Sequence, residues 1–82
     1  MQCPRCNALL ELLADPPDAG GFEFSLYGCP QCGHRQMFCF CVATGRSGTE
    51  AVTAEEAAII MNTADRDQLK RFMKEWQSRV IG

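Results

Sequence analysis

Several features that would assign this chain to a common class are missing from its 82 residues. No apolar run approaches the ~20 residues that span a bilayer, which predicts that the chain does not cross a membrane. Met1 and Gln2 lead directly into Cys3 without the basic and apolar segments of an export signal, so we expect a cytoplasmic protein. Only one histidine is present, and we find no nucleophile and base motif. We therefore expect no enzymatic activity.

The chain also lacks an excess of positive charge. Eight Lys and Arg residues against ten Asp and Glu residues give a formal net charge of −2. Four thiolates around one zinc ion would lower the charge to about −4. Because nucleic-acid binders usually present a basic surface, this balance favours a protein partner, with nucleic acid as the alternative. A homodimer is a further option.

Cysteine, by contrast, is abundant, with six residues in the chain. A domain of this size buries little apolar surface, and small folds often add disulfides or metals to compensate. In a reducing cytoplasm, closely spaced cysteine pairs indicate metal ligands rather than disulfides.

Four of the cysteines form two Cys-x-x-Cys pairs in similar surroundings. The segments Cys3-Pro4-Arg5-Cys6-Asn7 and Cys29-Pro30-Gln31-Cys32-Gly33 share a proline after the first cysteine and end in a residue that readily adopts the left-handed conformation. We expect each turn to direct two sulfurs toward one ion and its backbone amides toward sulfur, and two such turns give the closed tetrahedral shell of structural zinc. The predicted ligands of a single Zn²⁺ are Cys3, Cys6, Cys29 and Cys32. Disulfides and iron are the less favoured alternatives.

On these motifs, residues 3 to 42 resemble the zinc-ribbon, or rubredoxin-like, superfamily. The resemblance includes Cys-Pro-x-Cys-Gly-His at Cys29 to His34 and the apolar strand that follows. It implies that two cysteine turns cap a small three-stranded antiparallel sheet and that the ion is zinc. An electron carrier is a further alternative, because rubredoxins bind iron through the same pair of turns. The resemblance does not specify a function, since ribbons are reused in unrelated proteins.

The remaining pattern predicts strands first and helices afterwards. Apolar residues alternate over 22–27 and 37–42, and a shorter strand is expected over 8–13. Small, turn-forming residues predict a linker at 44–50. The capping-box pair Thr53 and Glu56 begins a helix over 54–62, and a second helix covers 66–80 with its apolar residues on one face. The expected fold is a small metal-stabilised α+β unit, with a three-stranded ribbon (1–43) and two helices (51–82) that pack on it.

Other residues admit two interpretations each. His34 is either a donor to a zinc-bound sulfur or an exposed side chain, and Cys39 and Cys41 are either extra ligands or core residues. The second helix offers candidates for partner binding, although the same residues suit a solvated face and a core: Lys70, Arg71, Phe72, Lys74 and Trp76. The function we expect from the sequence is a noncatalytic, zinc-binding interaction or adaptor module.

Overall fold

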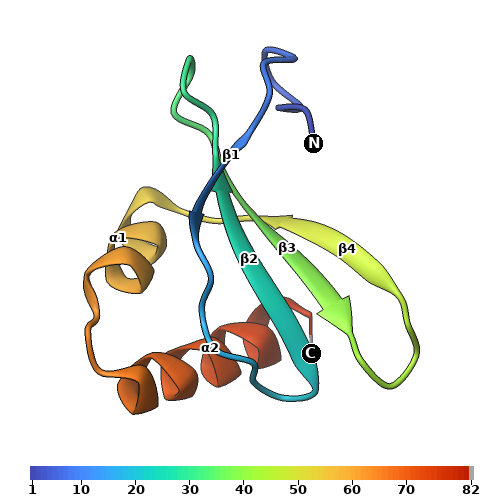
Figure 1. The fold of residues 1–82 in the computed structure, drawn as a ribbon, viewed down its shortest axis with the longest axis vertical. Coiled ribbons are helices and arrows are strands. Elements are labelled where there is room, and N and C mark those ends of the chain that lie inside the picture. Colours follow the sequence, from blue (N-terminus) through green and yellow to red (C-terminus); the bar gives the residue numbers. More distant parts are fainter. Residues whose placement is uncertain (82) are drawn as a thin grey trace.

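The computed structural model describes residues 1–81 and shows one antiparallel sheet followed by two helices (Figure 1). The strands are β1 (Glu11–Ala14), β2 (Phe22–Gly28), β3 (Arg35–Cys41) and β4 (Ser47–Ala51), and they lie side by side in chain order. The helices are α1 (Ala54–Asn62) and α2 (Arg66–Val80). Figure 1 shows the two cysteine turns at one end of the sheet and α2 near the opposite end.

The central pair of strands has one buried face. β2 and β3 pair in antiparallel register from Phe22 opposite Cys41 to Gly28 opposite Arg35. On one face, Phe24 lies opposite Cys39 and Leu26 lies opposite Met37, and all four residues are buried. Because successive side chains in a strand point to opposite faces, the intervening aromatic residues of β3 lie on the other side of the sheet, where they are half-buried.

The sheet has four strands, and the prediction of three was wrong. The additional strand, β4, occupies most of the segment expected to be a linker and pairs with β3 from Ser47 opposite Phe40 to Ala51 opposite Gln36. All of its residues are exposed, so it has no alternation of buried and exposed positions. It forms through backbone hydrogen bonds to β3 after a tight turn in which the Cys41 N–H donates to the Arg46 carbonyl at 2.8 Å. An exposed edge strand of small residues gives no signal in hydrophobic periodicity.

Both helices contribute to the core on the buried face of the sheet. Ile60 of α1 and Leu69, Met73 and Trp76 of α2 belong to the same buried cluster as the apolar residues of β2 and β3. The Trp76 ring meets the Phe24 ring edge to face, with centroids 5.9 Å apart and planes at 85°. Such aromatic pairs add to the stability gained from burial alone. The helices therefore pack on the ribbon and share one core with it.

Each helix begins at a side-chain cap. The Glu56 N–H donates to the Thr53 hydroxyl at 3.1 Å and the Thr53 N–H donates to the Glu56 carboxylate at 3.0 Å, so the predicted capping box is present. At α2, the Asp65 carboxylate accepts hydrogen bonds from the Asp67 N–H at 2.9 Å and the Gln68 N–H at 3.4 Å. These acceptors satisfy amides that lack partners within the helix. Within residues 1–81, neither helix has the length and apolar character that crossing a membrane requires.

Candidate metal centre

The first cysteine turn is held by its own backbone. The Asn7 N–H donates to the Cys3 carbonyl at 2.9 Å and the Cys3 N–H donates to the Ala8 carbonyl at 2.7 Å. Asn7 has a φ of 63°, the left-handed conformation expected from its residue type. This tight turn leaves the Arg5 N–H free to donate to the Cys3 sulfur at 3.4 Å.

The second turn repeats this arrangement in the connection between β2 and β3. The Gly33 N–H donates to the Cys29 carbonyl at 3.2 Å, and Gly33 has a φ of 77°, which glycine adopts without strain. The Cys32 N–H donates to the Cys29 sulfur at 3.4 Å. The sequence predicted that backbone amides of both turns would point at sulfur, and the structure confirms it for Cys3 and Cys29.

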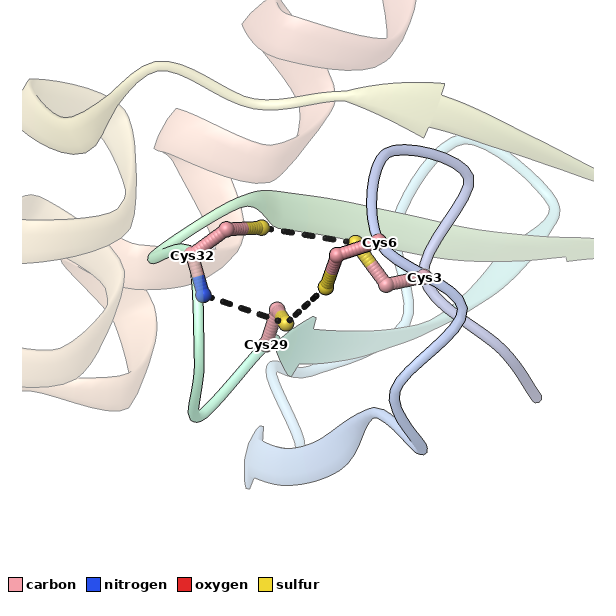
Figure 2. Close-up of side chains that lie close together, drawn as sticks. All are labelled: Cys3, Cys6, Cys29 and Cys32. Carbon is pink, nitrogen blue, oxygen red and sulfur yellow. Dashed lines mark hydrogen bonds between the residues drawn. The ribbon is translucent and has the colours of Figure 1, made fainter.

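The four sulfurs of the two turns converge at one point (Figure 2). They all lie within 4.8 Å of one another, with Cys3 Sγ 3.5 Å from Cys32 Sγ and Cys6 Sγ 3.3 Å from Cys29 Sγ. A disulfide would require about 2.05 Å, and the cysteines are free. Zinc–sulfur bonds of about 2.3 Å in a tetrahedron place the sulfurs roughly 3.8 Å apart. The donor set and its spacing therefore fit one thiophilic metal ion.

The two turns place their cysteines in equivalent positions of the candidate centre. Cys3 and Cys29, the first cysteine of each pair, are buried, with 0% and 3% of their surfaces exposed. Cys6 and Cys32, the second of each pair, are exposed. The centre thus lies at the protein surface, with one side against the polypeptide and one side accessible to chelators and protons.

The environment of the thiols favours a thiolate on Cys29. The hydrogen bond from the Cys32 backbone lowers the pKa of Cys29 most, and further hydrogen bonds outweigh burial, so that this pKa falls to about 6. For Cys6, a backbone hydrogen bond from Ala8 lowers the pKa, but the neighbouring thiols and burial together raise it to about 12. The hydrogen bonding of the pair therefore favours the proton on Cys6 and, on Cys29, the deprotonated form that a metal requires.

His34 contributes to the centre through its backbone. Its carbonyl accepts a hydrogen bond of 2.8 Å from the Cys29 N–H and so helps to fix the second turn. Its imidazole Nε2 lies 3.3 Å from Gln36 Oε1, and among residues 1–81 the ring makes no hydrogen bond to a sulfur of the centre. The sequence suggested a side-chain donor to sulfur, whereas the structure directs this side chain to Gln36.

The candidates for partner binding on α2 separate into two groups. Lys70, Arg71 and Lys74 are exposed, as a binding surface requires. Trp76 is fully buried with 0% exposure, and Phe72 is half-buried against the core. The suggestion that Trp76 anchors a partner is therefore corrected, because its ring is already covered by Phe24 and the rest of the core.

Cys39 and Cys41 lie away from the metal centre. Cys39 is buried in the core, and burial together with the charge of Glu50 raises its pKa to about 11. Cys41 is half-buried, and hydrogen bonds from Thr44 lower its pKa. Both line a surface cavity of about 290 Å³, together with residues that include Gly48 of β4. The sequence did not indicate this cavity, because it depends on the pairing of β4.

Comparisons with protein-family models, with curated proteins and with solved structures give no match for this chain. The resemblance to zinc ribbons therefore depends on the two cysteine motifs and on the convergence of their sulfurs.

Proposed function

We propose that this chain is a zinc-binding, noncatalytic interaction module whose metal centre stabilises the ribbon. The observation that carries the proposal is the convergence of four free cysteine sulfurs within 4.8 Å of one another. Two short turns with matching backbone hydrogen bonds supply these sulfurs from segments that are distant in sequence. An ion at this point would connect the N-terminal segment to the connection between β2 and β3.

The composition of the ligand set supports a structural ion. Catalytic zinc keeps one coordination position for water or substrate, whereas four cysteine ligands complete the tetrahedral shell. Thiolate ligands suit zinc and iron alike, and zinc is the metal of structural tetrathiolate sites. The free state of all the cysteines fits a reducing compartment such as the cytoplasm.

The charge of the chain supports a protein partner over nucleic acid. The formal charge of −2 becomes about −4 when a tetrathiolate zinc centre is counted. A polyanion would meet repulsion over much of such a surface, whereas a protein partner can match a local patch.

Metal analysis of the purified protein tests the proposal. Native mass spectrometry and elemental analysis should find one zinc ion per chain, and the sample should be colourless. Visible absorption from Fe(III)–thiolate charge transfer, with iron in place of zinc, would establish an electron carrier instead. A well-ordered monomer without metal would refute a stabilising role for the centre. Capture of a defined protein from the host by the zinc-loaded chain, unaffected by nuclease, is the result expected of the interaction role.

A further inference from the structure

One row of positive side chains on α2 has no acidic partner in the part of the chain that the structure describes. Arg66, Lys70 and Lys74 recur every four residues and are exposed. Residues at this spacing are neighbours on a helix, so the three charges form a row that we call the basic row. At 1.5 Å per residue it is about 12 Å long. The single ion pair within residues 1–81 joins Arg79 to Glu56, outside the row.

The basic row is unfavourable for the free protein. Like charges four residues apart on a helix repel each other and destabilise it. Arg66 is also the first residue of α2, where the helix dipole is positive and disfavours a cation. The neighbouring carboxylate is Asp67, three residues before Lys70 and four before Arg71, and within residues 1–81 it forms no ion pair with the row. A bound anionic group would relieve both effects.

The surroundings of the row favour a short acidic segment over nucleic acid. α2 carries five of the eight Lys and Arg residues of the chain, so the remainder has three cations against eight acids. A long polyanion extending beyond α2 would therefore meet a net acidic surface. Bound single strands also need aromatic rings on which bases stack, but Trp76 is buried and Phe72 packs against the core.

We propose that the basic row docks an extended acidic segment of a partner protein. Alternate side chains of an extended segment share one face and are about 6.8 Å apart. Residues four apart on a helix are separated by about 6 Å along the axis, so alternate carboxylates can follow the row in register. The inference rests on the proposed role as an interaction module and adds the surface and the partner class.

The test measures binding of a fluorescent peptide of alternating Glu and Ser to the zinc-loaded full chain. Fluorescence anisotropy at low ionic strength should show binding that weakens toward about 150 mM salt, where the Debye length is about 8 Å. Lys70→Gln/Lys74→Gln should weaken binding by about fivefold or more. The same variant should keep or raise the melting temperature, since it removes a like-charge pair.

A matched variant separates the effect of the basic row on binding from the effect of net charge. Arg46→Gln/Arg79→Gln removes two positive charges outside the row, and it should weaken binding less than twofold. Equal loss in both variants, or no binding of the peptide at low salt, would overturn the proposal. Tighter binding of charge-matched oligothymidylate through the same row would also overturn it, in favour of nucleic acid. Zinc content and circular dichroism of each sample show whether the module itself is intact, so a folded, zinc-loaded chain that ignores the peptide contradicts only the inference about α2.

Discussion

The two ends of the sheet are organised by different physical means. At the cysteine end, four sulfurs converge and the backbone turns that hold them are small and largely exposed. At the helical end, α2 packs over β2 and β3 together with α1, which also borders Gly33 of the second cysteine turn. The apolar cluster that these elements bury contains neither Cys3 nor Cys29. In a chain of 82 residues, apolar burial alone gives a modest margin of stability. We therefore propose that an ion bound by the four cysteines and the apolar core stabilise different parts of the same sheet.

Loss of one buried ligand should have the largest effect on this arrangement. Cys29→Ser removes a sulfur that accepts a hydrogen bond within the second turn and that belongs to the group of four converging sulfurs. Structural zinc contributes about 10 to 16 kcal/mol of apparent binding free energy, which is comparable to or greater than the ~5 to 15 kcal/mol stability of a whole domain. We expect the variant, and the wild-type chain after chelation, to lose amide chemical-shift dispersion at the cysteine end.

Cys41→Ser provides the matched control, because it replaces the same sulfur atom in a cysteine that is only half-buried and does not belong to the group of four converging cysteines. It should keep one zinc per chain and near-native dispersion. Native-like dispersion in metal-free Cys29→Ser would show that the turns fold without the ion.

Acid should also act on the cysteine end before the core. The pKa of Cys29 lies at about 6 in the folded chain, below the ordinary value of 9.0. Its thiolate therefore favours the folded state fully above pH 9, and this contribution is lost as the pH falls through about 6. Protons compete with zinc in the same direction, so we expect zinc release to begin below about pH 6. A colorimetric zinc indicator, read alongside tryptophan fluorescence, would follow both ends. Unfolding of the core before any zinc is released would reverse the expected order.

Removal of the Trp76 side chain is the corresponding change at the helical end. Trp76→Ala should destabilise the protein by about 3 to 5 kcal/mol, because it leaves a cavity beside Phe24 and Met73. Denaturant unfolding of the zinc-loaded protein would measure this loss. If the two ends are stabilised separately, the variant still binds one zinc under native conditions. If Trp76→Ala lost zinc under conditions in which the variant is fully folded, the core would be needed to position the cysteine turns.

A smaller aromatic substitution refines this test. Within the described residues, the Trp76 Nε1 is buried without a hydrogen-bond partner. An unsatisfied buried donor costs about 1 to 3 kcal/mol. Removing the indole N–H therefore offsets part of the stability lost with the larger ring. Trp76→Phe should therefore lose much less stability than Trp76→Ala. Equal losses would mean that the indole N–H is satisfied in solution.

The sequence anticipated the features that depend on local chemistry. Residue type and spacing were sufficient for the convergence of two cysteine turns, for the left-handed Asn7 and Gly33, and for the capping box at Thr53. The conformations of Asn7 and Gly33 and the capping box follow from interactions within a few residues. The meeting of the two cysteine turns was predicted instead from their chemistry, because four cysteine ligands complete one tetrahedral metal site.

Features that depend on distant pairing were missed. β4 has no apolar alternation and exists through backbone bonds to β3, so its composition resembled a linker. The apolar face of α2 was visible in the sequence, but a helical pattern does not distinguish a core from an interface. Only the packing of Trp76 on Phe24 decides between them.

The smallest expected effect concerns β4, which belongs to neither end. Gly48 pairs with Cys39 across the sheet, and a Cβ at this position would have no heavy atom within 4 Å beyond the residue itself and its two chain neighbours. Its φ is not positive, so its backbone does not require glycine. Gly48→Val should therefore stabilise the zinc-loaded protein by about 0.5 kcal/mol, through the higher strand propensity of valine and partial filling of the 290 Å³ cavity.

Denaturant titration would detect this gain, and zinc content should be unchanged. Gly33→Val is the opposing control, because the φ of 77° at Gly33 is strained for valine and belongs to the metal-binding turn. It should lower both stability and zinc affinity. Destabilisation by Gly48→Val of about 1 kcal/mol or more would show that the edge of the sheet is closely packed in solution, and that β4 contributes to the core rather than only extending the sheet beside it.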